Sequence, residues 1–454
     1  MLFDELLRPF LDQRPVAVLT RACLEHAFAS GDLDAMFERV ATTQYHHRLT
    51  FSGLVDLLGA VVTRRFGSVH SAYRADPARI GVSLASVYDK LNRTEPGLAE
   101  ALVKHTAARM RAVLDEWPGE PVPFAGLRLK VVDGNYLAGT DHRLKVLRGH
   151  GAAALPGMAI VIQDHATGLL TDLIAREDAY VNERRLVEPL LERIGPGEVI
   201  VADRNFCVQR LFEGIAGQQS YFIIRHHAGT KLEFQGEPRV VGPTPTGVVS
   251  EQAVRMGEAT YRCLSVTRIT PTRDNDGELR VLTNLPADHS GIAIAEAYRL
   301  RWTLEATFLE VTRAVQCELN TLGYPKAALL TFALALCASN ALRVVLRALE
   351  VAQGEAHPNE EPSSYYVVNE LANAYDGLTV AVPAEVWTAV RTWTPKELAA
   401  WLRQAAARAD WRRYRKAKRG PKKLVVPIIA GRNASHRSTA RLINNDRKSP
   451  AIPP

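Results

Sequence analysis

The sequence predicts an α/β protein: a mixed β-sheet core with a β-rich insertion, preceded by an all-α N-terminal domain and followed by a helical C-terminal region. Apolar residues recur at helical spacing up to about residue 120 and again from Ile292 onwards, whereas short apolar runs between turn residues fill the part between them. Because 454 residues exceed one ordinary domain, we expect boundaries where this pattern changes. The expected domains are 1–120, 121–320 and 321–454.

The N-terminal domain contains a segment with the character of a recognition helix. Residues 82–93 follow a serine N-cap pattern and carry Ser86, Lys90 and Arg93 on their polar side. An ordinary surface helix explains the same pattern, so the residues alone leave both interpretations open.

Pro121 and Pro123 end the helical region, and the chain becomes β-rich. A charged amphipathic helix at 182–194 and a second helix at 206–217 interrupt the strands. We expect the strands at 127–133, 158–163, 168–174, 198–202 and 221–225. Three strands, helix, strand, helix, strand is the order of a ribonuclease-H-like fold, in which carboxylates gather where strands end.

Residues 226–288 interrupt that order with Gly/Pro turns and alternating strands, the clearest at 261–269 and 278–286, and are expected to form the β-rich insertion. The longest apolar stretch, 327–342, contains a serine and an asparagine and is too short to span a membrane, so it predicts a buried helix.

Composition narrows the class of function. The apolar fraction of 47% is that of a globular protein, and the net charge of +7 favours a polyanionic partner. Five widely spaced cysteines without a Cys-x2-Cys pair are typical of a reduced chain without structural zinc. The first residues are acidic rather than basic, so no signal peptide is expected. No Gly-x4-Gly-Lys or Gly-x-Ser-x-Gly motif supports ATP use or serine hydrolysis.

Three acids and two phosphate-reading residues form the candidate site. Asp133 and Asp203 each end an apolar run. On a helix, Tyr298, Arg301 and Glu305 fall within roughly 60° of one another. Taken singly, each acid can be a turn residue, a strand-end ion pair or a solvated helix acid. Together, three carboxylates from distant segments suit two-metal phosphoryl transfer, because Mg²⁺ prefers hard oxygen ligands.

This arrangement resembles the DDE transposases of bacterial insertion sequences, in particular the group with a Tyr-x2-Arg-x3-Glu-x6-Lys helix. The resemblance covers the order of segments from about residue 40 to about residue 425 and departs from the pattern at Thr312, where the group has lysine. It implies cut-and-paste transposition, with Asp133, Asp203 and Glu305 as catalytic metal ligands for two Mg²⁺ ions that Mn²⁺ can replace.

The resemblance also implies the partners: double-stranded DNA, both terminal inverted repeats and target, bound by a homodimer without ATP or a membrane, in the bacterial cytoplasm at the nucleoid. Tyr298 and Arg301 would hold the terminal nucleotides, and the N-terminal domain would grip the transposon end through Lys90 and Arg93. Arg313, beside Thr312, either supplies the missing cation or is ordinary surface charge.

Other cations have two readings. Arg204 and Arg225 stand at predicted strand ends, where they touch DNA or neutralise the acids. Residues 411–423 contain eight Lys or Arg and no acid, which indicates either a solvated tail or phosphate contact. The DNA-binding candidates in this segment are Arg412, Arg413, Arg415, Lys416, Lys418 and Arg419.

Two alternatives remain open. A domesticated or decayed DNA-binding protein would keep the scaffold without strand transfer, and Thr312 is the residue that favours it. A ribonuclease-H-like DNA nuclease without transposition would share the acids but would not need the Tyr298/Arg301 face.

Overall fold

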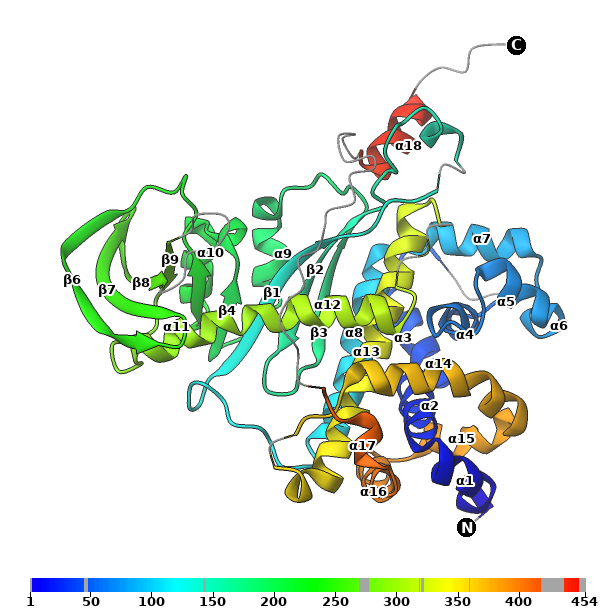
Figure 1. The fold of residues 1–454 in the computed structure, drawn as a ribbon. Helices are drawn as coiled ribbons and strands as arrows, with labels where there is room; N and C mark the ends of the chain where they lie inside the picture. Colours follow the sequence, from blue (N-terminus) through cyan, green and yellow to red (C-terminus); the bar gives the residue numbers. More distant parts are fainter. Residues whose placement is uncertain are drawn as a thin grey trace.

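The middle of the chain folds into one continuous sheet (Figure 1). The computed structural model describes residues 2–44, 48–141, 144–268, 277–317, 319, 322–358, 360–417 and 437–448. Within this part of the chain, nine strands pair in the order β3-β2-β1-β4-β5-β9-β8-β7-β6. The helical body lies beside one end of this sheet, and the last four strands form the opposite end (Figure 1).

The first five strands have the ribonuclease-H-like arrangement predicted from the sequence. They are β1 (Arg128–Tyr136), β2 (Met158–Asp164), β3 (Leu170–Arg176), β4 (Glu198–Ala202) and β5 (Tyr221–Arg225). β1, β2 and β3 are antiparallel neighbours, whereas β4 is parallel to β1 and β5 is parallel to β4. The fold class is therefore confirmed.

The crossover from β3 to β4 is shorter than the helix predicted at 182–194. It consists of a 3₁₀ turn, η2 (Glu183–Leu186), and one short helix, α9 (Val187–Leu191). Pro189 lies in α9 and has no N–H, so the residues before it cannot continue an α-helical hydrogen-bond ladder through this point. The next crossover contains η3 (Arg204–Phe206) and α10 (Gln209–Gly217), close to the predicted helix at 206–217.

Alternation along the strands gives the sheet two apolar faces, as expected for strands buried on both sides. Val131 and Val161 belong to one buried cluster, which continues into the helices of the body. Val132 and Ile160, their neighbours in sequence, belong to a second cluster on the other face, with residues of α9 and α10. The strand ends that carry polar residues are thereby held between two packed cores.

The β-rich insertion extends the same sheet. Its strands are β6 (Glu233–Thr244), β7 (Gly247–Met256), β8 (Ala259–Arg268) and β9 (Glu278–Thr283). β9 pairs antiparallel with β5, so that Ile224 stands opposite Leu282. The sequence indicated these strands but carried no signal that they continue the core sheet, because that depends on pairing between distant segments.

The helices from the two ends of the chain share one core. Those before the sheet are α1 (Leu2–Gln13), α2 (Pro15–Ala27), α3 (Ser30–Val40), α4 (Phe51–Val62), α5 (Val69–Ala75), α6 (Pro77–Ile80), α7 (Leu84–Arg93) and α8 (Pro96–Leu114). Those after it are α13 (Pro325–Gln353), α14 (Ser364–Ala381), α15 (Ala384–Thr392), α16 (Pro395–Ala406), α17 (Trp411–Tyr414) and α18 (Thr439–Lys448). α13 packs against α8, α2 and α16, so the first and last helices are not separate bodies.

α13 is the centre of this helical core. By length and composition the helical stretch Pro325–Ala356 resembles a membrane span, with a mean hydropathy of 1.9 over its most apolar window. That window is 83% buried inside the protein, so α13 is a core helix, as the sequence predicted for 327–342.

Candidate active site

Sheet register places the two aspartates side by side. β1 and β4 are parallel neighbours, and Val132 pairs with Ala202. Asp133 follows Val132 and Asp203 follows Ala202, so the two aspartates lie at the same level of the sheet. Asp203 leaves the strand as the N-cap of η3, where its carboxylate accepts a hydrogen bond of 2.8 Å from the Asn205 N–H.

Tyr298, Arg301 and Glu305 come from two helices rather than the one predicted. α11 (Gly291–Arg299) and α12 (Arg301–Ala314) meet at Leu300. Leu300 keeps helical backbone angles (φ −63°, ψ −17°), so the two helices run on in nearly the same direction across the sheet (Figure 1). Tyr298, Arg301 and Glu305 therefore still lie on one face, as predicted, although Leu300 separates the two helices.

Contacts with β2 hold α12 in place. Leu304 is fully buried on its underside. The Thr303 hydroxyl donates to the Gln163 side chain over 3.3 Å, and the Gln163 amide donates to the Thr307 hydroxyl over 3.2 Å. Gln163 belongs to β2, which pairs with β1, so α12 is fixed relative to the strand that carries Asp133.

Arg301 joins the acids. Its guanidinium lies 3.2 Å from the Asp133 carboxylate and 2.5 Å from the Glu305 carboxylate. It also donates to the Tyr298 hydroxyl. The Arg301 Nε is buried and has no hydrogen-bond partner among the described residues, so one donor of the guanidinium remains available to a ligand oxygen.

Burial and neighbouring charges shift the pKa values of Asp133 and Tyr298. Burial raises the pKa of Asp133 to about 6, Arg301 opposes this rise, and the charges of Asp203 and Glu305 add to it. Burial also raises the pKa of the Tyr298 phenol, against the effects of Arg301 and Arg225. Tyr298 is only 6% exposed, so its ring packs behind Arg301 rather than facing solvent.

A further buried carboxylate, Glu183, was missed in the sequence; it lies against Gly134, on the face of β1 opposite to the Asp133 side chain. Its side chain packs so closely on Gly134 that a β-carbon there would overlap the carboxylate. The pKa of Glu183 is raised to about 7, mainly by burial and in addition by the charges of Asp203 and Asp133, against the lowering effect of a hydrogen bond from Asn205. The sequence placed this residue inside a charged amphipathic helix, which hid it. The available signal was an acid immediately after a helix-capping asparagine that follows the third strand.

Asp133, Asp203 and Glu305 all offer carboxylate oxygen, the donor type that Mg²⁺ prefers. Arg301 keeps a free buried donor for an anion. Among the described residues, no three acids, histidines or cysteines stand close enough to enclose an ion as arranged. The Arg301 guanidinium lies between two of the acids, 3.2 Å from the Asp133 carboxylate and 2.5 Å from that of Glu305.

The other predicted contacts of the catalytic domain lie around this group. Arg204 is exposed in η3, directly after Asp203, and Arg225 ends β5 within electrostatic reach of Tyr298. Arg313 lies on α12, but its side chain, like that of Thr312, lies outside the described residues. DNA contact by these residues stays a prediction.

In the N-terminal domain, the predicted helix at 82–93 is α7, capped by Ser83. Its two cations differ. The Lys90 ammonium points into the body, donating to the Leu49 carbonyl over 2.5 Å and lying 5.4 Å from the centre of the Phe37 ring. Burial lowers the pKa of Lys90. Arg93 is exposed and pairs with Asp89 at 3.0 Å, so it is the better placed of the two for an external ligand.

The first part of the basic segment is folded rather than free. Trp411 and Tyr414 of α17 are buried. The neighbouring cations pair with acids: Arg413 with Glu370 at 3.8 Å, Arg415 with Glu360 at 3.1 Å and Lys416 with Glu361 at 2.8 Å. Arg412 is exposed, and Lys418 and Arg419 lie outside the described residues. Phosphate contact by the segment stays a prediction.

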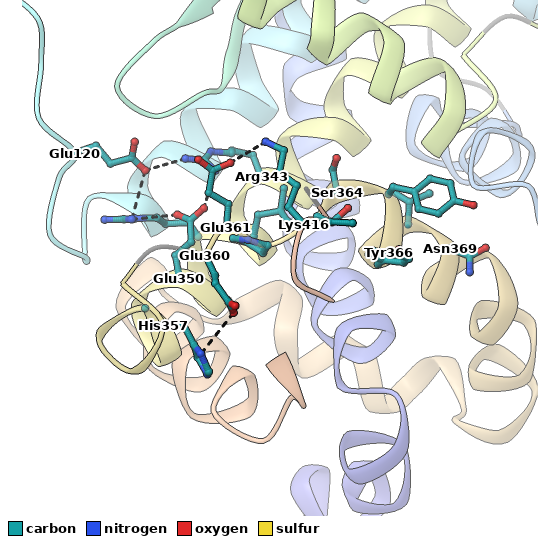
Figure 2. Close-up of a pocket in the computed structure, with 18 of the residues that line it drawn as sticks. Glu120, Arg343, Glu350, His357, Glu360, Glu361, Ser364, Tyr366, Asn369 and Lys416 are labelled. Atoms are coloured by element: carbon teal, nitrogen blue, oxygen red, sulfur yellow. Dashed lines mark hydrogen bonds and ion pairs between the residues drawn. The ribbon is translucent and has the colours of Figure 1, made fainter. Parts of the chain in front are cut away.

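A cavity of about 960 Å³ lies away from Asp133, between α13, α14 and residues 416–417 (Figure 2). Its charges compensate one another. Arg343 pairs with Glu120 at 2.9 Å, Arg347 pairs with Glu350 at 3.1 Å, and His357 faces Glu360 at 3.6 Å. The cavity therefore lacks the unbalanced charge of the group around Asp133.

The central part of the chain matches a known protein family. Residues 122–341 match the family model described as Transposase DDE domain. The match begins before β1, includes the insertion and α12, and ends within α13. No curated protein matches the chain.

Proposed function

We propose that this chain, whose residues 122–341 match the Transposase DDE domain model, moves an insertion sequence by cut-and-paste transposition, using two-metal phosphoryl transfer. The observation that carries the proposal is the register of β1 and β4, which sets Asp133 beside Asp203 under the helix that supplies Glu305. An acid from each of three distant segments at one point of the sheet is what this chemistry needs.

Asp133, Asp203 and Glu305 would hold the metal ions, with Mg²⁺ as the natural ion and Mn²⁺ as a substitute. Bound there, the ions would activate water or a DNA 3′-hydroxyl and stabilise the leaving oxygen. Asp133 is central because Arg301 contacts it and because Asp203 and Glu305 both raise its pKa.

Arg301 would change partners during the reaction. Without other cations its guanidinium neutralises Asp133 and Glu305. Once these acids are otherwise neutralised, the guanidinium is available to clamp a DNA phosphate with two hydrogen bonds. Tyr298, buried behind it, would orient the guanidinium, and both together would hold the terminal nucleotide.

The DNA partners would be the terminal inverted repeats and the target. Arg204 and Arg225 flank the acids, Arg93 is exposed on α7, and residues 412–416 add surface cations. We propose that a homodimer brings two ends together in the bacterial cytoplasm, without ATP. In this scheme contacts with DNA phosphates provide affinity, and α7 recognises the base sequence of the transposon end.

The test is an end-cleavage assay with purified protein and a DNA fragment carrying the inverted repeats that flank its gene. The proposal expects Mg²⁺-dependent nicks at the repeat boundary, released ends, and joined products in a target plasmid. Asp203→Asn, which keeps the size of the side chain, is the inactive control. Nicks without joined product would favour the nuclease, and specific binding without any nick would favour the decayed DNA-binding protein.

A further inference from the structure

Gln163 joins β2 to α12 through hydrogen bonds of its side chain. Only 5% of this residue is exposed. Its amide nitrogen donates to the Thr307 hydroxyl over 3.2 Å and to the Gly168 carbonyl over 3.1 Å. The Thr303 hydroxyl lies 3.3 Å from the Gln163 side-chain oxygen and also donates to the carbonyl of Leu300, at the junction of α11 and α12. We call Gln163, Thr303 and Thr307 the glutamine bridge.

The glutamine bridge and the candidate site lie on opposite flanks of α12. At 100° per residue, the two threonines lie about 160° around the helix from Arg301 and Glu305. Leu304, which is fully buried, lies between the two flanks. The threonine flank contacts β2 and the other flank contacts β1, and these strands are neighbours in the sheet. α12 is therefore held by the glutamine bridge on one side and by the contact of Arg301 with Asp133 on the other.

Rotation of α12 about its own axis would misplace Glu305. A side-chain carboxylate lies about 5–6 Å from the helix axis, so a rotation of about 10° moves it by roughly 1 Å. Metal–oxygen distances tolerate only about 0.2 Å. The burial of Leu304 opposes a small rotation weakly, because apolar burial has no preferred direction, whereas hydrogen bonds depend on direction. The glutamine bridge therefore supplies a directional contact that opposes this rotation.

We propose that Gln163 is a positioning residue: it keeps α12 from rotating, so that Glu305 stays in place while Arg301 turns from the acids to a DNA phosphate. The inference rests on the proposed function, in which Arg301 changes partners. Once Arg301 leaves Asp133, that contact no longer holds the helix. The glutamine bridge contains neither an acid nor Arg301, so it remains intact during this exchange.

A purely structural role makes a different prediction. If the glutamine bridge only stabilises the fold, the double variant Gln163→Met/Thr307→Val should recover both melting temperature and nicking rate relative to Gln163→Met. The reason is that both partners are then apolar and of similar shape, so neither leaves the other unpaired. If the bridge fixes the rotation of α12, the double variant should recover melting temperature but not nicking rate.

The first experiment measures nicking of an end fragment by the full chain at saturating Mg²⁺. Gln163→Met is expected to lower the nicking rate at saturating DNA at least tenfold, because a misplacement of about 1 Å can cost roughly 10²-fold in rate. KM for the DNA should stay within about twofold of wild type. If Gln163→Met does not fold, Thr307→Val, at a partly exposed position, should show the same split between rate and KM. Thr307→Ser, which keeps the hydroxyl, should nick like wild type.

The matched control is Asn340→Leu. Asn340 is a buried amide that joins α13 to β3, accepting from the Leu170 N–H over 2.8 Å and donating to the Leu170 carbonyl over 2.9 Å. Its replacement removes the same kind of contact between a helix and a strand, but away from α12. It should lower the melting temperature and leave the nicking rate of the folded protein within about twofold of wild type.

The second experiment needs neither DNA nor metal: hydrogen exchange of the α12 backbone amides is followed by mass spectrometry. Arg301→Ala and Gln163→Met each remove the contact on one flank of the helix. The double variant should exchange its α12 amides faster than the two single effects together predict, because either contact alone still holds the helix. Exchange in α13 should stay unchanged.

A wild-type nicking rate in folded Gln163→Met, recovery of that rate in Gln163→Met/Thr307→Val, or additive effects on α12 exchange would overturn the inference. Failure of the proposed function looks different. In that case the wild-type chain does not nick the end fragment, or Asp203→Asn nicks it at the wild-type rate.

Discussion

The Arg301 guanidinium lies 3.2 Å from the Asp133 carboxylate, although 168 residues separate the two in the sequence. The contact joins α12 to the end of β1, and the same guanidinium reaches Glu305 one turn further along α12. The Arg301 guanidinium therefore contacts two of the three proposed metal ligands, and its buried Nε–H still has no hydrogen-bond partner among the described residues.

The three acids should be needed for cleavage but not for folding. We expect Asp133→Asn, Asp203→Asn and Glu305→Gln to abolish Mg²⁺-dependent nicking while DNA-end binding stays within several-fold of wild type. Neutral variants relieve repulsion, so the metal-free melting temperature should not fall. Gel-based cleavage, filter binding and thermal melting check the three parts. Full nicking by Glu305→Gln would move the third carboxylate elsewhere on α12.

Arg301 and Tyr298 should act on DNA rather than on the metals. Arg301→Ala is expected to keep Mn²⁺ binding and to nick the first strand better than it completes the later steps, which need the terminal nucleotide held. Arg301→Lys should restore those steps only in part, because an ammonium lacks the planar two-donor fork. Tyr298→Phe, which keeps the packing, should show a milder version of the Arg301→Ala pattern. The readout is a gel assay on a pre-nicked end. Equal loss of nicking and joining in Arg301→Ala would mean that the residue supports the fold or the metals.

The metal-free protein should lose stability as pH rises through the acid range. Asp133 has its pKa raised from 3.8 to about 6. For a raised carboxyl pKa, the stabilising contribution is complete below the unfolded value and is lost as pH rises to the folded value. The free energy of unfolding of wild type minus that of Asp133→Asn should fall by roughly 2 kcal/mol between about pH 4 and pH 6. Urea unfolding across this range measures it, and Mn²⁺ should reduce the fall by competing with protons. A difference that is independent of pH would contradict the burial of this carboxyl.

Lys90 and Arg93 should have different roles despite their shared helix. Lys90→Ala removes a half-buried stem and its hydrogen bond to Leu49, so it should destabilise the protein by about 1–2 kcal/mol with little direct effect on DNA. Arg93→Ala should leave stability within about 0.5 kcal/mol and weaken binding to the transposon end. Urea unfolding and end-binding titrations separate the two effects. The reverse assignment would show that α7 does not face DNA in the way proposed.

The basic segment should contribute affinity more than specificity. Truncation after Asp410 would also remove the buried Trp411 and Tyr414, and truncation after Ala417 would still remove α18, so the cleaner variant keeps the full chain and replaces Lys418 and Arg419 with alanine. Each phosphate contact that is lost should flatten the slope of log affinity against log salt by roughly 0.9. Discrimination between end and random DNA should change little. Arg412→Ala, an exposed residue of α17, tests the folded part alone. An unchanged slope in both variants would show that the segment is only solvated.

The sequence predicted what depends on local pattern. Apolar runs marked the five core strands, and the aspartates at the ends of two of them indicated the site. The apolar runs and the positions of the aspartates did not predict the pairing of β9 with β5 or the break between α11 and α12 at Leu300, because both arise from packing between distant segments. The same reason explains Glu183 and Lys90: each looks like a surface charge in sequence, and only the tertiary contacts with Gly134 and Leu49 bury them.

The central claim is that Asp133, Asp203 and Glu305 form one metal site. Iron-mediated backbone cleavage tests it most directly: Fe²⁺ replaces Mg²⁺, and ascorbate with peroxide generates radicals that cut the chain within reach of the bound ion. We predict fragments that end near residues 133, 203 and 305 in the same reaction, with excess Mg²⁺ suppressing all three cuts and Asp203→Asn removing them. Cuts confined to other parts of the chain, or cuts near these residues that persist in Asp203→Asn, would contradict the account.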